Sequence, residues 1–532
     1  MRIAGLLLAI SALAAAAQQP APPFDLLITG GKIVDGSGNA WFRADLGIHN
    51  GRIAAIGALR GQATRRTIDA RNHVVAPGFV DMMGASSEPL LDDRATAESK
   101  LRQGITTILA GEGGSTAPST KWPTFGAYFK ALEAKGIPMN AIHNVGAAQV
   151  RRQVIGDENR APTEAEMAKM RGLVEQAMRD GVAGFSTALI YPPGTYATTA
   201  ELVEMAKVAA RYGGIYFTHM RNESHALLEA ISESIRIGRE GGVPVHIFHL
   251  KAAGQANWPL MQRAVDAIQG ARELGLDVTA DIYPYVRNGL GLTSLIHPKH
   301  FGQGAAPFLK TLSDPAVRAA LRREIESTSD WENWYRHAGS NWDNLLVASV
   351  GAGIDKAYEA KSIAQIAKLR GADEWTTFFD LVATGPVSVN PKSMNEEQKH
   401  LGLRTEWVSV CTDAPPTPIT ATGTHPRAFG SFARVLGHYV REERVISLEA
   451  AIRKMTSLAA NRLGLHDRGR IATGLAADLV VFDPEKVRDV ATFEKPLAYS
   501  EGIPHVIVNG VAVIDAGRFT NANPGRVLRY RQ

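Results

Sequence analysis

The stretch "GFSTALIYPPGTYATTAELVEMAKVAARYGGIYFTHM" spans residues 184–220 and contains the unit from which the fold is built. It starts with a short apolar run, passes through a segment of helical character and ends in a second apolar run. Thr198 and Glu201 have the spacing of a capping box, which predicts that a helix begins there. The stretch therefore predicts a strand, a helix and a second strand parallel to the first.

The same alternation continues on both sides of this stretch. Short apolar runs that end in polar residues are separated by amphipathic segments such as 163–181, which has its own capping box at Thr163 and Glu166. Eight such units predict a closed (β/α)8 barrel in the α/β class. A doubly wound open sheet is the alternative, but no glycine-rich phosphate loop follows the first strand. The eight runs are "HVVAPGFVDMMG", "GITTILAGEG", "AIHNVGAAQ", "VAGFSTAL", "GIYFTHM", "VPVHIFHLK", "DVTADIYPY" and "WVSVCTDA".

The first residues have the pattern of a secretory signal peptide, with one arginine, an apolar stretch and small residues up to about residue 17. The apolar stretch is shorter than the roughly 20 residues that span a membrane, so we expect an exported, periplasmic or secreted protein without a membrane span. The chain has 532 residues, and its formal net charge of +5 comes without a basic cluster, so a nucleic-acid partner is not expected. A single cysteine, Cys411, excludes an internal disulfide.

Polar residues follow several of the predicted strands, where the active sites of such barrels lie. His219 and His249 follow consecutive strands, so their imidazoles can meet on one metal ion, and imidazole with carboxylate suits Zn²⁺. Lys251 lies two residues beyond His249 and shares its face, whereas His246 has the opposite parity and is expected to pack in the core. Glu112 is a candidate third ligand, although a helix-terminal or salt-bridge role would also explain it.

Asp413 and Tyr283 complete the set of candidates at the strand ends. Asp413 follows a buried strand, where a carboxylate is costly unless a metal, a ligand or amides bind it. We expect Asp413 to be catalytic and Tyr283 to face the same pocket.

Several long motifs, in order along the chain, resemble the D-aminoacylase branch of the amidohydrolase superfamily. They are the opening stretch with its continuation "RNE", and "APGFVD", "VHIFHLKAAG", "DIYPY", "HPRAFGSFARVLGHYVREE" and "DRGRIATGLAADLVVFDP". The resemblance implies a small β-sandwich built from residues 24–77 and 466–532, beside a barrel over 78–465. The residues from about 286 to 404 are too many for one loop and predict a helical insertion over the pocket mouth together with the remaining crossover.

The resemblance also implies a role for each candidate residue. His219 and His249 match the family's metal-binding histidines, and Asp413 matches its general base. Lys251 and Tyr283 match the residues that hold the substrate carboxylate.

The sequence departs from the family pattern at the ligands of one ion. Met83 and Ala85 stand where an Asp-x-His-x-His motif would place its histidines. The family's bridging cysteine aligns with Gly113. Glu112, the residue before it, has a longer side chain that would reach the metal. We therefore expect one Zn²⁺ per chain, and we consider Glu88 as a further acid near the vacated space.

Together these features predict an enzyme that hydrolyses the amide bond of N-acyl amino acids, with the D series favoured by the resemblance. One Zn²⁺ and Asp413 would activate water. The expected partner is a small substrate that carries a carboxylate. A hydrolase of another linear or cyclic amide or of a dipeptide is the alternative, and a non-catalytic protein with a decayed metal site is a third. The sequence leaves the oligomeric state open.

Overall fold

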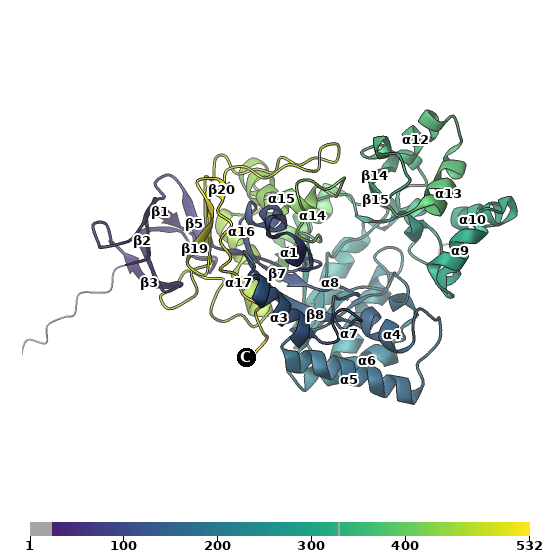
Figure 1. Ribbon diagram of the computed structural model, residues 1–532, viewed down its shortest axis with the longest axis horizontal. Coiled ribbons are helices and arrows are strands. Elements are labelled where there is room, and N and C mark those ends of the chain that lie inside the picture. The colour runs from purple at the N-terminus through teal and green to yellow at the C-terminus, as the bar shows by residue number, and fades with distance from the viewer. Residues whose placement is uncertain (1–23, 328–329, 532) are drawn as a thin grey trace, which may run out of the picture.

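The computed structural model describes residues 24–327 and 330–531. The predicted signal peptide lies outside these residues. The described chain forms a barrel, a separate β-sheet domain beside it and an inserted subdomain on the other side, as Figure 1 shows. No helix in residues 24–327 or 330–531 is both long enough and apolar enough to cross a membrane.

Eight parallel strands form the predicted barrel, which confirms the (β/α)8 fold class. Their order in the sheet is β6, β7, β8, β9, β10, β11, β12 and β16, so neighbours in the sheet follow one another along the chain apart from the insertion before β16. The strands are almost wholly buried, because helices cover their outer face and side chains fill the interior. Their bounds are β6 Phe79–Asp81, β7 Ile105–Ala110, β8 Asn140–Gly146, β9 Gly184–Ala188, β10 Ile215–His219, β11 Val245–Ile247, β12 Val278–Ile282 and β16 Val408–Val410.

Helices between the strands pack around the barrel. The helix α5 begins with the capping box that Thr163 and Glu166 predict, with both of its hydrogen bonds formed. In α6 the Thr198 side chain accepts a hydrogen bond from the backbone of Glu201. The main helices are α3 Phe125–Lys135, α5 Glu164–Asp180, α6 Thr199–Ala210, α7 Leu227–Gly241, α8 Leu260–Glu273, α14 Glu396–Arg404 and α16 Leu448–Met455. Shorter ones are α1 Pro89–Asp92, α2 Glu98–Leu101, α4 Ala147–Val154, α15 Arg427–Arg434 with a π-helix at Val435–Glu442, and α17 Ser457–Arg462.

Side chains join the first and last strands of the barrel, β6 and β16, which are the two ends of the sheet order. The Asp81 carboxylate accepts hydrogen bonds from the backbone N–H of Thr412 (2.9 Å) and from its hydroxyl (2.6 Å). The Lys100 ammonium lies 3.1 Å from the same carboxylate, and both side chains are wholly buried. We call Asp81, Lys100 and Thr412 the seam.

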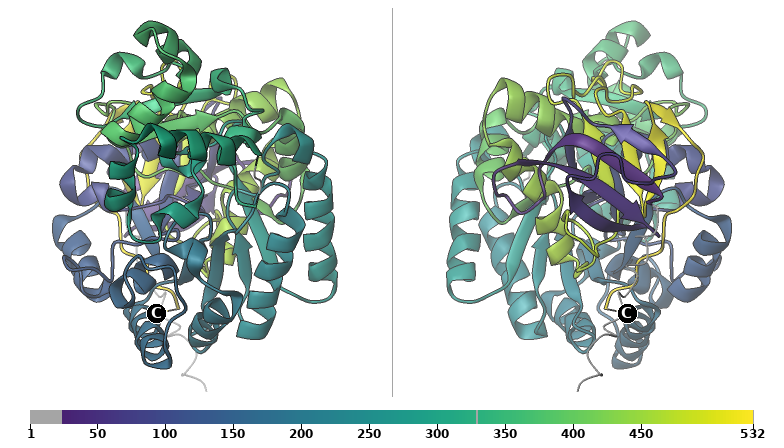
Figure 2. Two further views of the ribbon diagram at one scale, coloured as in Figure 1. Left: turned by 90° about the vertical axis from the view of Figure 1, so that its right-hand side faces the viewer. Right: turned by 90° about the vertical axis from the view of Figure 1, so that its left-hand side faces the viewer.

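Both ends of the chain build the separate β domain, as the resemblance implies. Its nine strands run in the order β20, β19, β18, β17, β5, β1, β2 and β3, with β4 beside β1. The strand β5 pairs with β1 from the N-terminal part and with β17 from the C-terminal part, which joins the two. Figure 2 shows these purple and yellow strands together in its right-hand view. The bounds are β1 Leu26–Ile33, β2 Phe42–His49, β3 Arg52–Gly57, β4 Thr67–Asp69, β5 Val74–Pro77, β17 Leu479–Phe482, β18 His505–Val508, β19 Val511–Asp515 and β20 Arg518–Phe519.

The insertion between β12 and β16 contains a small sheet as well as helices. Its strands β13, β15 and β14 pair antiparallel around an aromatic core that includes Trp334, Trp342 and Trp375. The last helix before β16, α14, contacts β12 and β16 and so belongs to the barrel layer. The inserted elements are β13 Leu290–Gly291, β14 Leu345–Val350, β15 Val387–Pro391, α9 Ala305–Thr311, α10 Pro315–Ser327, α11 Trp334–His337, α12 Ile363–Arg370 and α13 Glu374–Thr384.

Candidate active site

A cavity of about 220 Å³ lies at the carboxyl ends of the barrel strands. It brings together all six residues that the sequence singles out, although they come from five different strand ends. Two further charged residues, Glu223 and Arg427, line the same cavity. The predicted residues are Glu112, His219, His249, Lys251, Tyr283 and Asp413.

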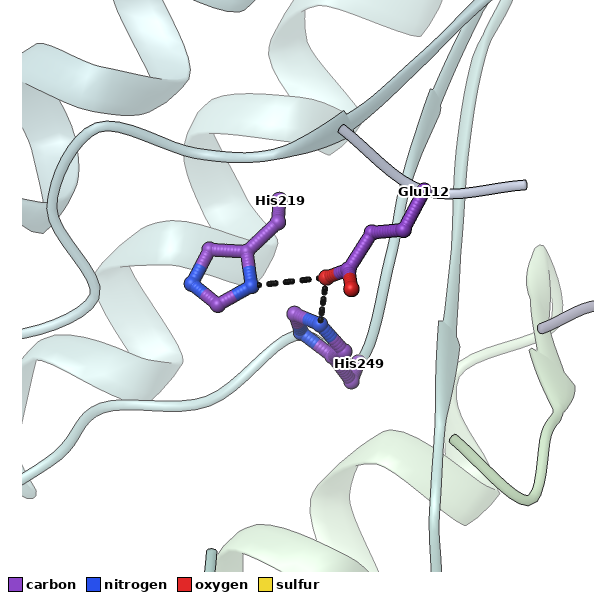
Figure 3. Close-up of side chains that lie close together, drawn as sticks. All are labelled: Glu112, His219 and His249. Carbon is purple, nitrogen blue, oxygen red and sulfur yellow. Dashed lines mark hydrogen bonds and ion pairs between the residues drawn. The ribbon is translucent and has the colours of Figure 1, made fainter. Parts of the chain in front are cut away.

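Glu112, His219 and His249 form a compact trio (Figure 3). Glu112 Oε1 lies 3.0 Å from His219 Nδ1 and 3.4 Å from His249 Nε2. Ligands at 2.0–2.2 Å from a tetrahedral Zn²⁺ are separated by about 3.3–3.6 Å. The two distances from Glu112 lie near this range, and all three ligand atoms lie within 4.8 Å of one another, so small side-chain shifts would accommodate the ion. Two imidazole nitrogens and a carboxylate also match the donors that zinc prefers. The trio therefore fits a zinc ion and leaves a fourth position open.

The charges of the trio are coupled to one another. Partial burial raises the pKa of Glu112, but hydrogen bonds from His219 and His249 outweigh it and hold the pKa below its usual range. Burial and Lys251 lower the pKa of His249, whereas the carboxylates of Asp413, Glu223 and Glu112 raise it to about 9 overall. Protons therefore compete with a metal ion for the trio.

Glu223 lies on the far side of both histidines, and the sequence analysis did not identify it. Its carboxylate is 3.4 Å from His219 Nε2, 3.0 Å from His249 Nδ1 and 2.6 Å from Lys251 Nζ. Burial raises the pKa of Glu223, but the charges of His219, Lys251 and His249 hold it well below its usual range. Lys251 thus enters the cavity as one half of a buried ion pair.

Asp413 pairs with Arg427, the second residue that sequence reasoning missed. Burial raises the pKa of Asp413, and the neighbouring Arg427 guanidinium partly offsets this rise. The same guanidinium lies 4.7 Å from the ring centre of Tyr283, and Lys251 Nζ lies 5.7 Å from it. Burial raises the pKa of Tyr283 well above its usual range, so its hydroxyl keeps the proton and can donate a hydrogen bond.

Three residues that line the cavity have backbone conformations that residues other than glycine rarely adopt. His249, Asp413 and Ala85 have φ angles of 38°, 51° and 55°. A left-handed conformation costs a non-glycine residue roughly 1–2 kcal/mol. Strain of this kind is concentrated at functional sites, where surrounding contacts fix the geometry.

The β6 side of the cavity carries no counterpart of the trio. Met83 is buried in an apolar cluster, and Ala85 lines the cavity without a ligand atom. Glu88 lines a different cavity and lies 3.4 Å from the exposed Lys121. His246 packs in the core and contacts Thr279 and Asp281, as its parity predicts.

A larger cavity of about 700 Å³ adjoins the candidate active site. Tyr191 and Trp334 line both cavities. Trp331, Ile296 and Phe301, which belong to the insertion, contribute to the wall of the larger one. The insertion therefore borders the space through which a substrate would reach the trio.

Comparisons with known proteins agree with this architecture. The model of the amidohydrolase family matches residues 66–514. The D-aminoacylase of Alcaligenes xylosoxydans xylosoxydans is 35% identical over 529 residues, which cover 96% of this chain and 99% of that protein. The structure of an N-acyl-D-glutamate deacylase from Bordetella bronchiseptica, with zinc and a phosphonate mimic of the tetrahedral intermediate, has a TM-score of 0.82 at 32% identity and covers 95% of this chain and 100% of its own. A D-aminoacylase structure, whose binuclear centre shows one-metal activation and second-metal attenuation, has a TM-score of 0.81 at 32% identity with the same coverage.

Proposed function

Since the chain belongs to the amidohydrolase family, in its D-aminoacylase branch, we propose that it hydrolyses the amide bond of N-acyl-D-amino acids with a single zinc ion held by Glu112, His219 and His249. The observation that carries this proposal is the trio itself, which shares one cavity with Asp413. A base beside a metal site is what the attack of water on an amide requires.

The charges that line the cavity favour one divalent ion and an anionic substrate. Three carboxylates, those of Glu112, Glu223 and Asp413, face two cations, Lys251 and Arg427. One divalent ion turns this excess of negative charge into a single positive charge, which one substrate carboxylate would balance. A second divalent ion would leave a larger uncompensated charge, and Met83 and Ala85 offer no strong ligand for it. The D-aminoacylase in which one metal activates and a second attenuates supports a centre of this kind.

Zinc held by the trio would act as a Lewis acid, which would lower the pKa of water to about 7 and polarise the amide carbonyl. Asp413 accepts the proton of the attacking water on its carboxylate and delivers it to the departing nitrogen. The raised pKa of Asp413 suits the first of these transfers, because it makes the carboxylate a stronger base toward the proton of the water.

The opposite wall of the cavity holds the substrate by its carboxylate. Lys251 offers the ammonium donors that Glu223 leaves free, and Tyr283 offers a neutral hydroxyl. Arg427 places a second cationic group beside them. Fixing the carboxylate orients the neighbouring amide toward the trio, which converts binding into alignment of the reacting atoms.

A substrate screen with matched variants tests the proposal. The purified protein, stripped of metal and then given one equivalent of Zn²⁺, should hydrolyse N-acetyl-D-amino acids faster than their L counterparts. The Asp413→Asn variant should bind the same zinc and hydrolyse neither series. Hydrolysis of cyclic imides without hydrolysis of N-acyl amino acids would instead support the alternative substrate class.

We also propose that the mature enzyme acts outside the cytoplasm, because residues 1–17 have the pattern of a signal peptide. Mass spectrometry of the protein from its host should find a chain that starts near Gln18. Recovery of a soluble chain that still begins at Met1 would contradict this assignment.

A further inference from the structure

Glu223 faces both histidines of the trio from the side opposite Glu112. Each imidazole has one nitrogen toward Glu112 and the other toward Glu223. For His219 these are Nδ1 at 3.0 Å from Glu112 and Nε2 at 3.4 Å from Glu223. For His249 the order is reversed, with Nε2 at 3.4 Å from Glu112 and Nδ1 at 3.0 Å from Glu223. The two carboxylates thus enclose the two rings from opposite sides.

The position of the proton decides whether such a ring can bind a metal. A neutral imidazole carries one proton, and only the other nitrogen can act as a ligand. A carboxylate at the far nitrogen holds the proton there and turns the near nitrogen to the metal. Glu223 can do this for both rings, because each of its oxygens faces one of them.

Among the described residues, the polar side-chain contacts of Glu223 are confined to the two histidines and the residues beside them. Its Oε2 and the Nε2 of His219 are both buried, and neither forms a hydrogen bond elsewhere in the described part of the chain. Its Oε1 lies 2.6 Å from Lys251 Nζ, which in turn lies 2.7 Å from His249 Nδ1. An ammonium only donates, so a hydrogen bond from Lys251 to His249 Nδ1 would leave the imidazole proton on Nε2, the nitrogen that faces Glu112. Glu223 Oε1 lies within reach of both groups, so it can accept from Lys251 and from a protonated Nδ1 together, which frees Nε2 for the metal.

We propose that Glu223 is a positioning residue that selects the tautomer in which both His219 and His249 bind the metal, and that it also compensates the charge of Lys251 beside them. This inference rests on the proposed zinc centre. It assigns a defined role to a carboxylate that lies outside the trio and contacts the substrate wall only through its ion pair with Lys251. Loss of a residue that orients metal ligands in this way typically weakens metal binding 10- to 100-fold.

Zinc affinity, measured by competition with a chromophoric chelator, tests the inference without relying on activity. The Glu223→Gln variant should bind Zn²⁺ about 10- to 100-fold more weakly than the unaltered protein. Glu201→Gln is the matched control. Glu201 forms an equally buried ion pair with Arg151, with 2.7 Å between their charged atoms, and this pair does not line the cavity. The control should keep the original affinity. Equal affinity of the Glu223→Gln variant and the unaltered protein would overturn the inference.

A double variant separates tautomer selection from charge compensation. If Glu223 served only to neutralise Lys251, the Lys251→Met/Glu223→Gln variant would regain the original affinity, and the tautomer role would be wrong. We expect it to remain at least about tenfold weaker. Should Glu223→Gln fail to fold, Glu223→Asp keeps the charge but withdraws it from the rings, and it should show the same loss. Failure of the unaltered protein to bind zinc would refute the proposed function itself, which distinguishes the two results.

Discussion

Two groups of buried charges lie at the mouth of the barrel, and they differ in what holds them together. The trio and Glu223 come from the ends of β7, β10 and β11, and Glu112 Oε1 is shared between two imidazoles beside an open cavity. At the seam, the Lys100 ammonium contacts Asp81, Thr412 and the carbonyl oxygen of Ala414, so its three donors are all used. The first group can take up an exchangeable ion, whereas the second contains a cation that is part of the chain.

This difference gives a physical account of the lost His-x-His motif. The strand β6 keeps Asp81, but its carboxylate bonds to Lys100 and Thr412 across the seam. Met83, two residues further, packs into the apolar interior. The β6 end therefore contributes to closing the barrel, and the candidate metal ligands lie at the ends of β7, β10 and β11.

The largest effect should follow from Asp413→Asn. An amide cannot accept the water proton, so kcat should fall about 10²- to 10⁴-fold. Elemental analysis should find the same zinc content as before, because Asp413 lies outside the trio. Loss of zinc together with activity would contradict this assignment and place Asp413 among the metal ligands.

Removal of the seam cation should lower the stability of the fold and leave zinc binding unchanged. The variant Lys100→Met leaves the wholly buried Asp81 without its ion-pair partner, which typically costs about 3–5 kcal/mol in the free energy of unfolding. Urea denaturation measures the loss, and Lys130→Met on the surface-facing side of α3 is the control that should change little. An unchanged midpoint for Lys100→Met would mean that the seam does not hold the barrel together.

The substrate wall is tested by Lys251→Met. Losing a buried charge-assisted contact should lower kcat/KM for carboxylate substrates by more than tenfold, or about 2–5 kcal/mol. A substrate whose carboxylate is replaced by an amide should lose far less on the same substitution. Equal losses for both substrates would show that Lys251 does not bind the substrate carboxylate and acts only through its contacts with the residues around the trio.

The smallest change should appear in the pH profile of Arg427→Met. Asp413 acts only as the carboxylate, so kcat/KM falls as the pH drops through its pKa, which burial raises above the usual value. Arg427 lowers that pKa, so its removal should move the acidic limb to higher pH. A limb that moves to lower pH would show that another group controls it.

The sequence predicts the barrel well because the signal is repeated. Most of the eight strands are short apolar runs followed by a helix, and such runs are typical of strands buried on both faces. The sheet of the insertion carries no such signal, since β13 has only two residues and β15 ends at a proline.

The candidate site is predicted where residues follow strands directly, and it is missed where loops fold back. Glu223 follows His219 by four residues and has the pattern of an acid near a helix start. Only the return of this loop beneath the rings places it against both histidines. Arg427 opens a helix 14 residues after Asp413, and only the loop between them turns its side chain back to that carboxylate. Lys100 lies in "ESKL", where its burial depends on how α2 meets the seam and not on local pattern.

The number of zinc ions per chain tests the central claim most directly. The protein should be stripped with a chelator, titrated with Zn²⁺ and freed of loosely held metal, and its zinc content and amide hydrolysis measured on the same sample. We predict one tightly bound equivalent, full activity at that point, and the same result for Met83→Leu on the β6 side. Two tightly bound equivalents, both required for activity, would contradict a centre built from Glu112, His219 and His249 alone.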